Sequence, residues 1–419
     1  MNTRAPALEP RALDGVGVSA ALARLGHRVA SSERAAWLAK DVLVPFIGTR
    51  AVLLLAAWLA THLLPAGPFP GIWANWPEWW MTALSNWDGR WYLSIVRDGY
   101  NYLPDQQSNI AFSPLYPLSM WALAGVVGAR DELSWLLAGI TVSNVSLLAS
   151  MALLRALVRL DHDARTAGRA ALYLALFPTS LFLSALYADS LYLALALGAL
   201  YAARRRAWCA AGTLGALATL ARPHGVLIGL PLAIEYGLAI RAAVRSRGAP
   251  SVRAWLHPGV LWLGLIPLAL VAWAAYVFQL TGDPLAFMRA QAAWGRELTP
   301  PWETLRRMFD GPLYPHGGWW GWDHSMLDLA AAVLFLALVT ASFRLVRPSL
   351  AIYGAAVFLT MVSNGALAAD MRYGLAIVPA FVVLALAGRL SAFHQAYLVG
   401  ASVLSAVFTV LFSAGYWVA

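Results

Sequence analysis

Residues 86–117 read NWDGRWYLSIVRDGYNYLPDQQSNIAFSPLYP, and they form the only long segment of the chain in which aromatic, acidic and basic residues alternate. Apolar runs surround this segment on both sides. Within it, Trp91, Tyr92 and Ile95 recur at helical spacing, whereas charged residues fall on another face. The pattern predicts a helix that lies along a membrane surface, with the carboxylate of Asp88 near its start.

The composition of the whole chain indicates a membrane protein with many spans. Of the 419 residues, 60% are hydrophobic and only 12% are charged, which is too few charges for a soluble domain of this size. The net charge of +9 comes from arginines at the ends of apolar runs, so cytoplasmic anchoring explains it better than nucleic-acid binding. The single cysteine, Cys209, has no ligand spacing around it, so a disulfide or a cysteine-based metal site has no support.

We expect about eleven transmembrane helices, because that many apolar runs are long enough, or nearly long enough, to cross a bilayer. The runs are 42–64, 133–154, 170–186, 190–203, 208–221, 226–240, 260–280, 327–343, 350–367, 373–386 and 397–417. A further run, 110–128, has two prolines in its opening SPLYPL, and proline in the first turns argues against a spanning helix.

The arginines determine how this further run is placed. Four stretches carry an excess of arginine, and they are 155–169, 204–206, 241–253 and 344–347. All four face the cytoplasm together only if a single crossing separates Ser108 from Arg155. We therefore expect 110–128 to be a re-entrant or surface segment. The rival interpretation makes it a full span and puts 155–169 outside.

The sequence thus predicts an all-α polytopic membrane protein with one transmembrane domain at 42–419, after a cytoplasmic tail at 1–41. Two extracytoplasmic loops are expected at about 65–108 and 281–323, with the N-terminus inside and the C-terminus outside. Four polar features then meet on the outer side. They are the Asp88 loop, the hairpin YADS at 187–190, the turn ARPHG at 221–225 and the turn AADMRY at 368–373.

Two carboxylates, Asp88 and Asp189, are the candidate catalytic groups. For Asp88 the competing interpretation is a helix N-cap. Its neighbours Trp87, Arg90 and Tyr92 are candidate substrate-binding residues, and they would half-bury it while the arginine keeps it ionised as a base. Asp189 lies between two apolar runs, where a charge costs on the order of 2.5–3.5 kcal/mol. It is either a polar hairpin tip or an orienting partner for the acceptor or for Asp88.

Arg222 and Arg372 are the candidate substrate-binding cations, since both fall outside against the usual bias of positive charge to the inside. The forked guanidinium of arginine fits a phosphate, which an anionic lipid head group would present. The alternatives are snorkelling to the interface or pairing with an acid such as Asp370. His224 and Tyr373 follow in the same turns and complete the candidate binding residues, although a histidine at a helix end is also a common structural group.

Motifs for other chemistries do not occur in the sequence. It has no HExxH, no His/Cys cluster, no glycine-rich phosphate loop and no GxSxG. Metal-dependent hydrolysis, nucleotide binding and serine chemistry therefore have no support, and we expect no metal and no cofactor.

Several segments resemble one family. WDGRWYLSIVRDGY followed by AFSPLYPL is similar to the first outer loop of the PIG-V group, the second mannosyltransferase of GPI-anchor assembly with its bacterial relatives. FPTSLFLSALYADSLYLAL, LATLARPHGVLIGLPL and MRYGLAIVPAFVVLA resemble later segments of the group. The resemblance covers roughly 87–381 and implies a GT-C glycosyltransferase, a polyprenyl- or dolichyl-phosphate sugar donor and transfer on the extracytoplasmic side.

On matching positions, the two acids of the family fall on Asp88 and Asp189, and its turn arginine falls on Arg222. Two departures concern the acceptor more than the reaction. A histidine common after the loop acid in eukaryotic members is replaced by Trp91 and Tyr92, and the hairpin acid is Asp rather than Glu.

We therefore expect an inverting transfer of a sugar, mannose by the resemblance, from a polyprenyl-phosphate donor to a lipid-linked or cell-envelope glycan, with Asp88 as general base in the cell membrane. Membrane lipid is an expected partner, and nucleic acid is not. The tryptophans of 281–323 suit interface anchors, and a minority of them suit stacking on a sugar ring. One alternative is a transporter or flippase with two related halves. Another is a structural subunit that docks a partner through the Asp88 loop.

Overall fold

The computed structural model describes residues 35–64, 79–128, 130–247, 258–310 and 325–418, and this part of the chain is helical with no strand. The helices are α2 (Val44–Leu63), α3 (Trp79–Ser85), α4 (Asp88–Asp98), α5 (Leu115–Val126), α6 (Glu132–Val158), α7 (Ala164–Leu176), α8 (Asp189–Arg204), α9 (Trp208–Ala221), α10 (Gly229–Arg247), α12 (Leu265–Thr281), α13 (Ala286–Arg289), α14 (Pro301–Asp310), α15 (Ser325–Leu345), α16 (Pro348–Val362), α17 (Asp370–Tyr373), α18 (Val378–Ala387) and α19 (Ser391–Ser413). Among the shorter turns, η3 (Ser180–Leu183), η4 (Pro223–Ile228) and η6 (Ala290–Trp294) bear on the site.

The expected all-helical, multi-pass membrane architecture is confirmed. Six helices of the described part are long and apolar enough to cross a bilayer, or seven if the bent pair α17–α18 is one span. The first of them begins at Ala35, inside the segment assigned to the tail, and 1–34 lie outside the described residues. The count of about eleven spans is not confirmed. The helices α7, α8, α9, α16 and α18 have only 10 to 16 residues, whereas a full span needs about 20.

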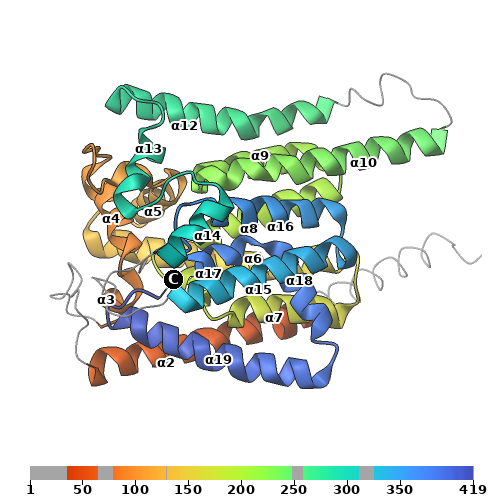
Figure 1. Cartoon of the computed structure of the whole chain (residues 1–419), viewed down its shortest axis with the longest axis horizontal. Helices are drawn as coiled ribbons and strands as arrows, with labels where there is room; N and C mark the ends of the chain where they lie inside the picture. Colours follow the sequence, from red (N-terminus) through yellow and green to blue (C-terminus); the bar gives the residue numbers. More distant parts are fainter. Residues whose placement is uncertain (1–34, 65–78, 129, 248–257, 311–324, 419) are drawn as a thin grey trace, which may run out of the picture.

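The long helices lie side by side in one bundle, and α4, α5 and α13 gather at one of its ends (Figure 1). Helix α5 has 12 residues, so it is about 18 Å long and too short to cross the hydrocarbon core. Its Tyr116 packs edge-on against Tyr92 of α4, with ring centroids 4.8 Å apart. The helix within 110–128 is thus shorter than a full span, as are several helices of the bundle, and the placement of 110–128 as a surface or re-entrant segment stays a prediction.

The described arginine-rich stretches meet at the opposite end of the bundle, where ion pairs connect the helix ends. Arg204 at the end of α8 pairs with Asp161 at 2.6 Å, and Arg389 after α18 pairs with Asp163 at 2.9 Å. Arg155 near the end of α6 pairs with residue Asp41 at 2.6 Å. These pairs place the stretches 155–169 and 204–206 on one shared end, as the sequence predicts. The compartment that this end faces stays a prediction.

The segment between α7 and α8 does not continue the helix, so the expected apolar span at 170–186 is wrong in its second half. Helix α7 ends at Leu176, two residues before Pro178, which cannot donate a helical hydrogen bond. The buried guanidinium of Arg50 on α2 instead donates to the carbonyl oxygens of Ala175 (2.8 Å) and Ser180 (3.0 Å) and to the Ser184 hydroxyl (2.8 Å). This arginine satisfies backbone carbonyl groups that the broken helix leaves free, and it fixes the buried segment that leads to Asp189.

Candidate active site

A strained turn precedes α4. Trp87 has φ 60° and ψ −114°, a conformation that costs a non-glycine residue about 1–3 kcal/mol. The fully buried hydroxyl of Tyr187 holds the turn from both sides, because it donates to the carbonyl oxygen of Asn86 (3.0 Å) and accepts the backbone N–H of Asp88 (3.2 Å). The backbone of Tyr187 is held in turn by Ser143, whose hydroxyl donates to its carbonyl oxygen at 3.1 Å.

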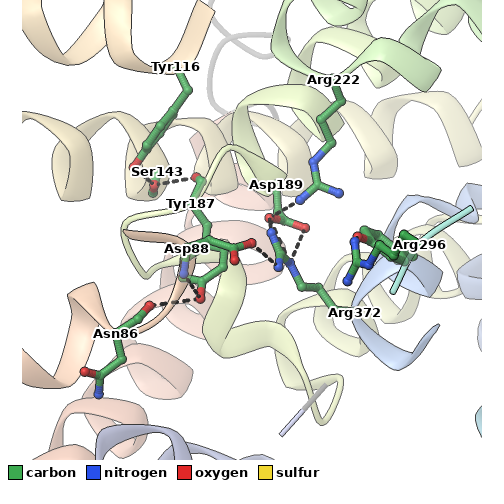
Figure 2. A network of polar contacts seen from close by, with 10 residues as sticks. Asn86, Asp88, Tyr116, Ser143, Tyr187, Asp189, Arg222, Arg296 and Arg372 are labelled. Atoms are coloured by element: carbon green, nitrogen blue, oxygen red, sulfur yellow. Dashed lines mark hydrogen bonds and ion pairs between the residues drawn. The ribbon is translucent and has the colours of Figure 1, made fainter. Parts of the chain in front are cut away.

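The carboxylate of Asp88 does not cap the helix, so the N-cap interpretation is wrong. Asp88 is the first residue of α4, and its Oδ2 accepts a hydrogen bond of 2.6 Å from Nη1 of Arg372 (Figure 2). Arg372 lies on α17, 284 residues further along the chain. The strained turn therefore directs the first acidic side chain of α4 toward a distant arginine instead of the free N–H groups of its own helix.

Asp189 connects the two candidate cations. Nη2 of Arg372 donates to its Oδ2 at 3.0 Å, and Nη2 of Arg222 donates to the same oxygen (Figure 2). Asp189 and Arg372 are only 5% and 3% exposed, whereas Asp88 is 20% exposed by its side chain. The pairing of Arg372 is thus with Asp88 and Asp189. Asp370 was the acid expected as the alternative partner. Its carboxylate oxygens form no hydrogen bond within the described part of the chain.

A cavity of about 1420 Å³ opens beside this network. Eight of the nine residues predicted for the site line it, and they are Trp87, Asp88, Arg90, Tyr92, Arg222, His224, Arg372 and Tyr373. The ninth, Asp189, is not among the lining residues and lies behind the two arginines that it binds. Asp88 is therefore the carboxylate of the network that a ligand can contact, and Asp189 acts on a ligand through the arginines.

Three further arginines line the cavity, and they are Arg90, Arg296 and Arg307. Arg90 lies on α4, and burial lowers the pKa of its guanidinium, which remains charged because arginine titrates far above neutral pH. Arg296, which the sequence did not single out, donates to the hydroxyl of Tyr373, and its guanidinium carbon lies 5.1 Å from the centre of that ring. It comes from a loop with three other nearby arginines, so nothing in the sequence distinguished it.

Aromatic rings surround the charged groups. Arg372 lies 4.4 Å from the ring centre of Tyr187 and 5.1 Å from that of Phe182, both within the range of cation–π attraction. The ring of His224 packs edge-on against Tyr192 at 4.9 Å, so this histidine is held between the cavity and the bundle. Burial raises the pKa of Tyr92, which keeps its phenol neutral at physiological pH.

Metal-binding side chains are not clustered in the described part of the chain, where no three or more His, Cys, Asp and Glu residues are close enough to hold an ion. The electropositive groups that face the cavity are guanidinium groups. A phosphate is the ligand group whose geometry and charge fit several forked guanidinium groups best.

Comparison with known proteins assigns the family. The family model described as Mannosyltransferase (PIG-V) matches residues 56–281, which is more than half of the chain. The chain belongs to the PIG-V mannosyltransferase family. The resemblance found in the sequence is thereby confirmed, and the matched region contains Asp88, Asp189 and Arg222 but not Arg372.

Similar proteins include two GPI mannosyltransferases. GPI mannosyltransferase 2 of Yarrowia lipolytica is 30% identical over 44% of this chain and 49% of its own length. GPI alpha-1,6-mannosyltransferase 2 of Mus musculus is 31% identical over 53% of this chain and 48% of its own length. This PIG-V family chain therefore spans about half the length of the curated relatives it matches.

Two solved structures have a similar arrangement of helices. The oligosaccharyltransferase of Archaeoglobus fulgidus is 13% identical, with a TM-score of 0.47 over 91% of this chain and 56% of that one. ArnT of Cupriavidus metallidurans is 17% identical, with a TM-score of 0.48 over 86% of this chain and 63% of that one. Both scores lie below 0.5, so the family assignment rests on the sequence match.

Proposed function

We propose that this PIG-V family protein is an integral-membrane glycosyltransferase that moves a sugar, mannose by family, from a polyprenyl-phosphate donor to a lipid-linked or cell-envelope glycan on the extracytoplasmic face. The reaction inverts the anomeric carbon, and Asp88 is the general base. The observation that carries the proposal is a carboxylate and several guanidinium groups facing one cavity that also has an apolar wall.

The charge of the cavity supports an anionic donor. Five arginines and two acids, Asp88 and Glu297, line the cavity. Asp189, which lies behind the arginines, adds one more negative charge, so the net charge of these groups is +2. A polyprenyl-phosphate sugar is a phosphodiester with one negative charge. The polyprenyl phosphate that departs is a phosphomonoester, whose charge approaches −2 near neutral pH. The fixed charges therefore complement the phosphate better as the sugar leaves, and such differential binding accelerates transfer.

The apolar wall supports an isoprenoid chain on that phosphate. Residues of α12 and α16 supply this wall, and they include Leu270, Val271, Ala274, Val357 and Met361. Val271 is 62% exposed and Leu268, one turn away, is 56% exposed, so the face of α12 continues from the cavity toward lipid. A prenyl tail lying along this face would bury its methylene and methyl groups at about 25 cal/mol per Å² while its phosphate meets the arginines.

The proposed step is a single displacement. Asp88 accepts the proton of an acceptor hydroxyl, whose oxygen attacks the anomeric carbon of the donor sugar. The bond between that carbon and the phosphate oxygen breaks through an oxocarbenium-like transition state, and its electron pair stays on the phosphate. Arg222 and Arg372 stabilise the developing charge, and Asp189 holds both of these arginines in position.

Replacement of Asp88 tests the proposal. With purified polyprenyl-phosphate mannose and membrane-derived acceptor, Asp88→Asn is expected to reduce the transfer rate by about 10²–10⁴-fold, the usual cost of losing a positioned general base. Arg372 keeps Asp189 as a partner in this variant, so folding is expected to persist. The matched control is Asp98→Asn on the same helix, where the carboxylate is 57% exposed and pairs with Arg97. Transfer by Asp88→Asn at the rate of this control would refute the assignment of the base.

A further inference from the structure

Three aromatic rings from distant segments meet at one side of the cavity. We call Trp91, Phe112 and Trp294 the aromatic corner. The ring centroids of Trp91 and Phe112 are 6.1 Å apart with nearly parallel planes, and Trp294 stands edge-on to Trp91 at 5.6 Å and to Phe112 at 5.9 Å. All three residues line the cavity and are only half-buried, so the rings retain surface that a ligand can cover.

Two polar groups beside the aromatic corner are buried without a hydrogen bond to the described residues. Ser113, which follows Phe112 and is 4% exposed, has no partner for its hydroxyl, and Arg90 has none for its Nε. Both residues line the cavity. An unsatisfied buried polar group costs about 1–3 kcal/mol, so a ligand with hydroxyl groups that bonds both would recover that energy.

The position of the corner on α4 relates it to the proposed base. Trp91 follows Asp88 by three residues, so the two side chains are neighbours on the helix surface, with Cβ atoms about 5–6 Å apart. Arg222 and Arg372 reach the network from η4 and α17 instead. The base thus has an aromatic platform along its own helix and the paired cations across from it.

We infer that the aromatic corner binds the sugar of the acceptor, a hexopyranose at the end of a glycan. This inference rests on the proposed function. The C–H face of the pyranose stacks on Trp91, while its hydroxyl groups bond the Ser113 hydroxyl and the Arg90 guanidinium. One further hydroxyl then lies beside Asp88, which is where a nucleophile must lose its proton. The donor is held separately, with its phosphate on the arginines and its chain on α12 and α16.

Two ligands distinguish the two halves of the cavity. Saturation-transfer NMR on the protein in nanodiscs measures the binding of methyl α-mannopyranoside, and native mass spectrometry measures the binding of undecaprenyl phosphate. Trp91→Ala is expected to weaken mannoside binding at least fivefold and leave undecaprenyl phosphate bound, with Trp91→Phe restoring most of the loss. Arg222→Gln is expected to weaken the binding of undecaprenyl phosphate and leave the mannoside bound. Trp302→Ala, the same change at a tryptophan that is 74% exposed on α14, is the control.

Ser113→Ala removes only a hydroxyl group, and it is expected to weaken mannoside binding at least threefold without loss of folding. Mannoside binding by Trp91→Ala or Ser113→Ala at the level of Trp302→Ala would overturn the inference. So would the absence of any mannoside signal in the wild type at millimolar concentration. If the wild type binds the mannoside at the aromatic corner but never binds undecaprenyl phosphate, the proposed donor fails while the sugar site stands.

Discussion

The hydroxyl oxygen of Tyr187 lies 3.2 Å from the backbone nitrogen of Asp88 and accepts its hydrogen bond. The same hydroxyl donates to the carbonyl oxygen of Asn86, so one phenol spans the strained residue Trp87. Its ring lies 4.4 Å from the guanidinium carbon of Arg372, the ion-pair partner of Asp88. Tyr187 therefore orients the proposed base through its hydroxyl and the opposing cation through its ring.

Tyr187→Phe separates these two contributions. The variant keeps the ring against Arg372 but leaves two backbone groups without their partner, so the turn at Trp87 can relax. We expect the maximal transfer rate to fall about tenfold while the affinity for undecaprenyl phosphate changes less than twofold. The control is Tyr397→Phe, which removes a hydroxyl that donates to the carbonyl oxygen of Tyr173 away from the cavity. An equal effect of both variants on the rate would contradict the positioning role.

Asp189→Asn is expected to lower the stability of the folded protein, in addition to any effect on the transfer rate. The change leaves Arg222 and Arg372 without the buried carboxylate that both of them bind, and an uncompensated buried charge typically costs about 3–5 kcal/mol. Thermal unfolding of the protein in detergent should show a much larger drop in midpoint for Asp189→Asn than for Asp88→Asn. If the two variants unfolded at the same temperature, Asp189 would not be holding the arginines together.

Gly225 lies in the turn that carries Arg222 and His224, and close packing fixes its identity. A Cβ atom at this position would lie 2.4 Å from the carbonyl oxygen of Ala218 and 2.6 Å from the backbone nitrogen of Thr219. Gly225→Ala should therefore push the turn away from α9 and reduce both the unfolding midpoint and transfer. Gly237→Ala on α10 is the matched control, since nothing lies within 4 Å of its Cβ and alanine favours a helix by about 1 kcal/mol.

The proposed topology can be tested by labelling single cysteines in a Cys209→Ser background. Gln106 is exposed near the end of the bundle that holds α4, and Arg206 is exposed at the arginine-rich end. In intact cells, a membrane-impermeant maleimide should label Gln106→Cys, and it should label Arg206→Cys only after the membrane is opened. The opposite pattern would place the cavity on the cytoplasmic side and refute the proposed location of transfer.

The carboxylate of Asp163 makes the stability of the arginine-rich end sensitive to acid. Its carboxylate accepts hydrogen bonds from the backbone N–H of Thr166 (2.9 Å) and from Arg389 (2.9 Å). These bonds lower the pKa of Asp163 below the ordinary 3.8, and the hydrogen bonding to Thr166 contributes more than the bond from Arg389. A group whose pKa is lower in the folded state contributes stability above its unfolded pKa and loses it as the pH falls through its folded pKa. Asp163→Ala should thus lower the free energy of unfolding by about 1 kcal/mol at pH 7. Its deficit relative to the wild type should shrink below pH 4, and a constant deficit would contradict this assignment.

The sequence identified the charged residues of the site because each lies in a short polar turn between apolar runs. Asp88, Arg222 and Arg372 stood out on that basis, and the structure brings them into one network. Tyr187 and Arg296 did not, since their roles depend on contacts with segments 101 and 77 residues away. A hydrophobicity pattern records which residues are apolar, but it does not record which distant backbone group a tyrosine hydroxyl will meet.

The break after Leu176 was missed for a related reason. Residues 177–186 are nearly as apolar as a span, so hydropathy alone extends the helix through them. The stabilising partner of the broken segment is Arg50, which lies more than 120 residues earlier and belongs by composition to the first apolar run. Pro178 was the local signal for the break.

Helices α7, α8 and α9 have 13, 16 and 14 residues and extend only about 20–24 Å, against a hydrocarbon core of about 30 Å. Asp189 is the first residue of α8 and Arg222 follows the last residue of α9, so under the proposed topology we expect the ionic network at acyl-chain depth. A prenyl lipid then reaches it by sideways diffusion without leaving its leaflet. Encounter is a two-dimensional search, and turnover should scale with the mole fraction of donor among the lipids instead of its concentration in the aqueous volume.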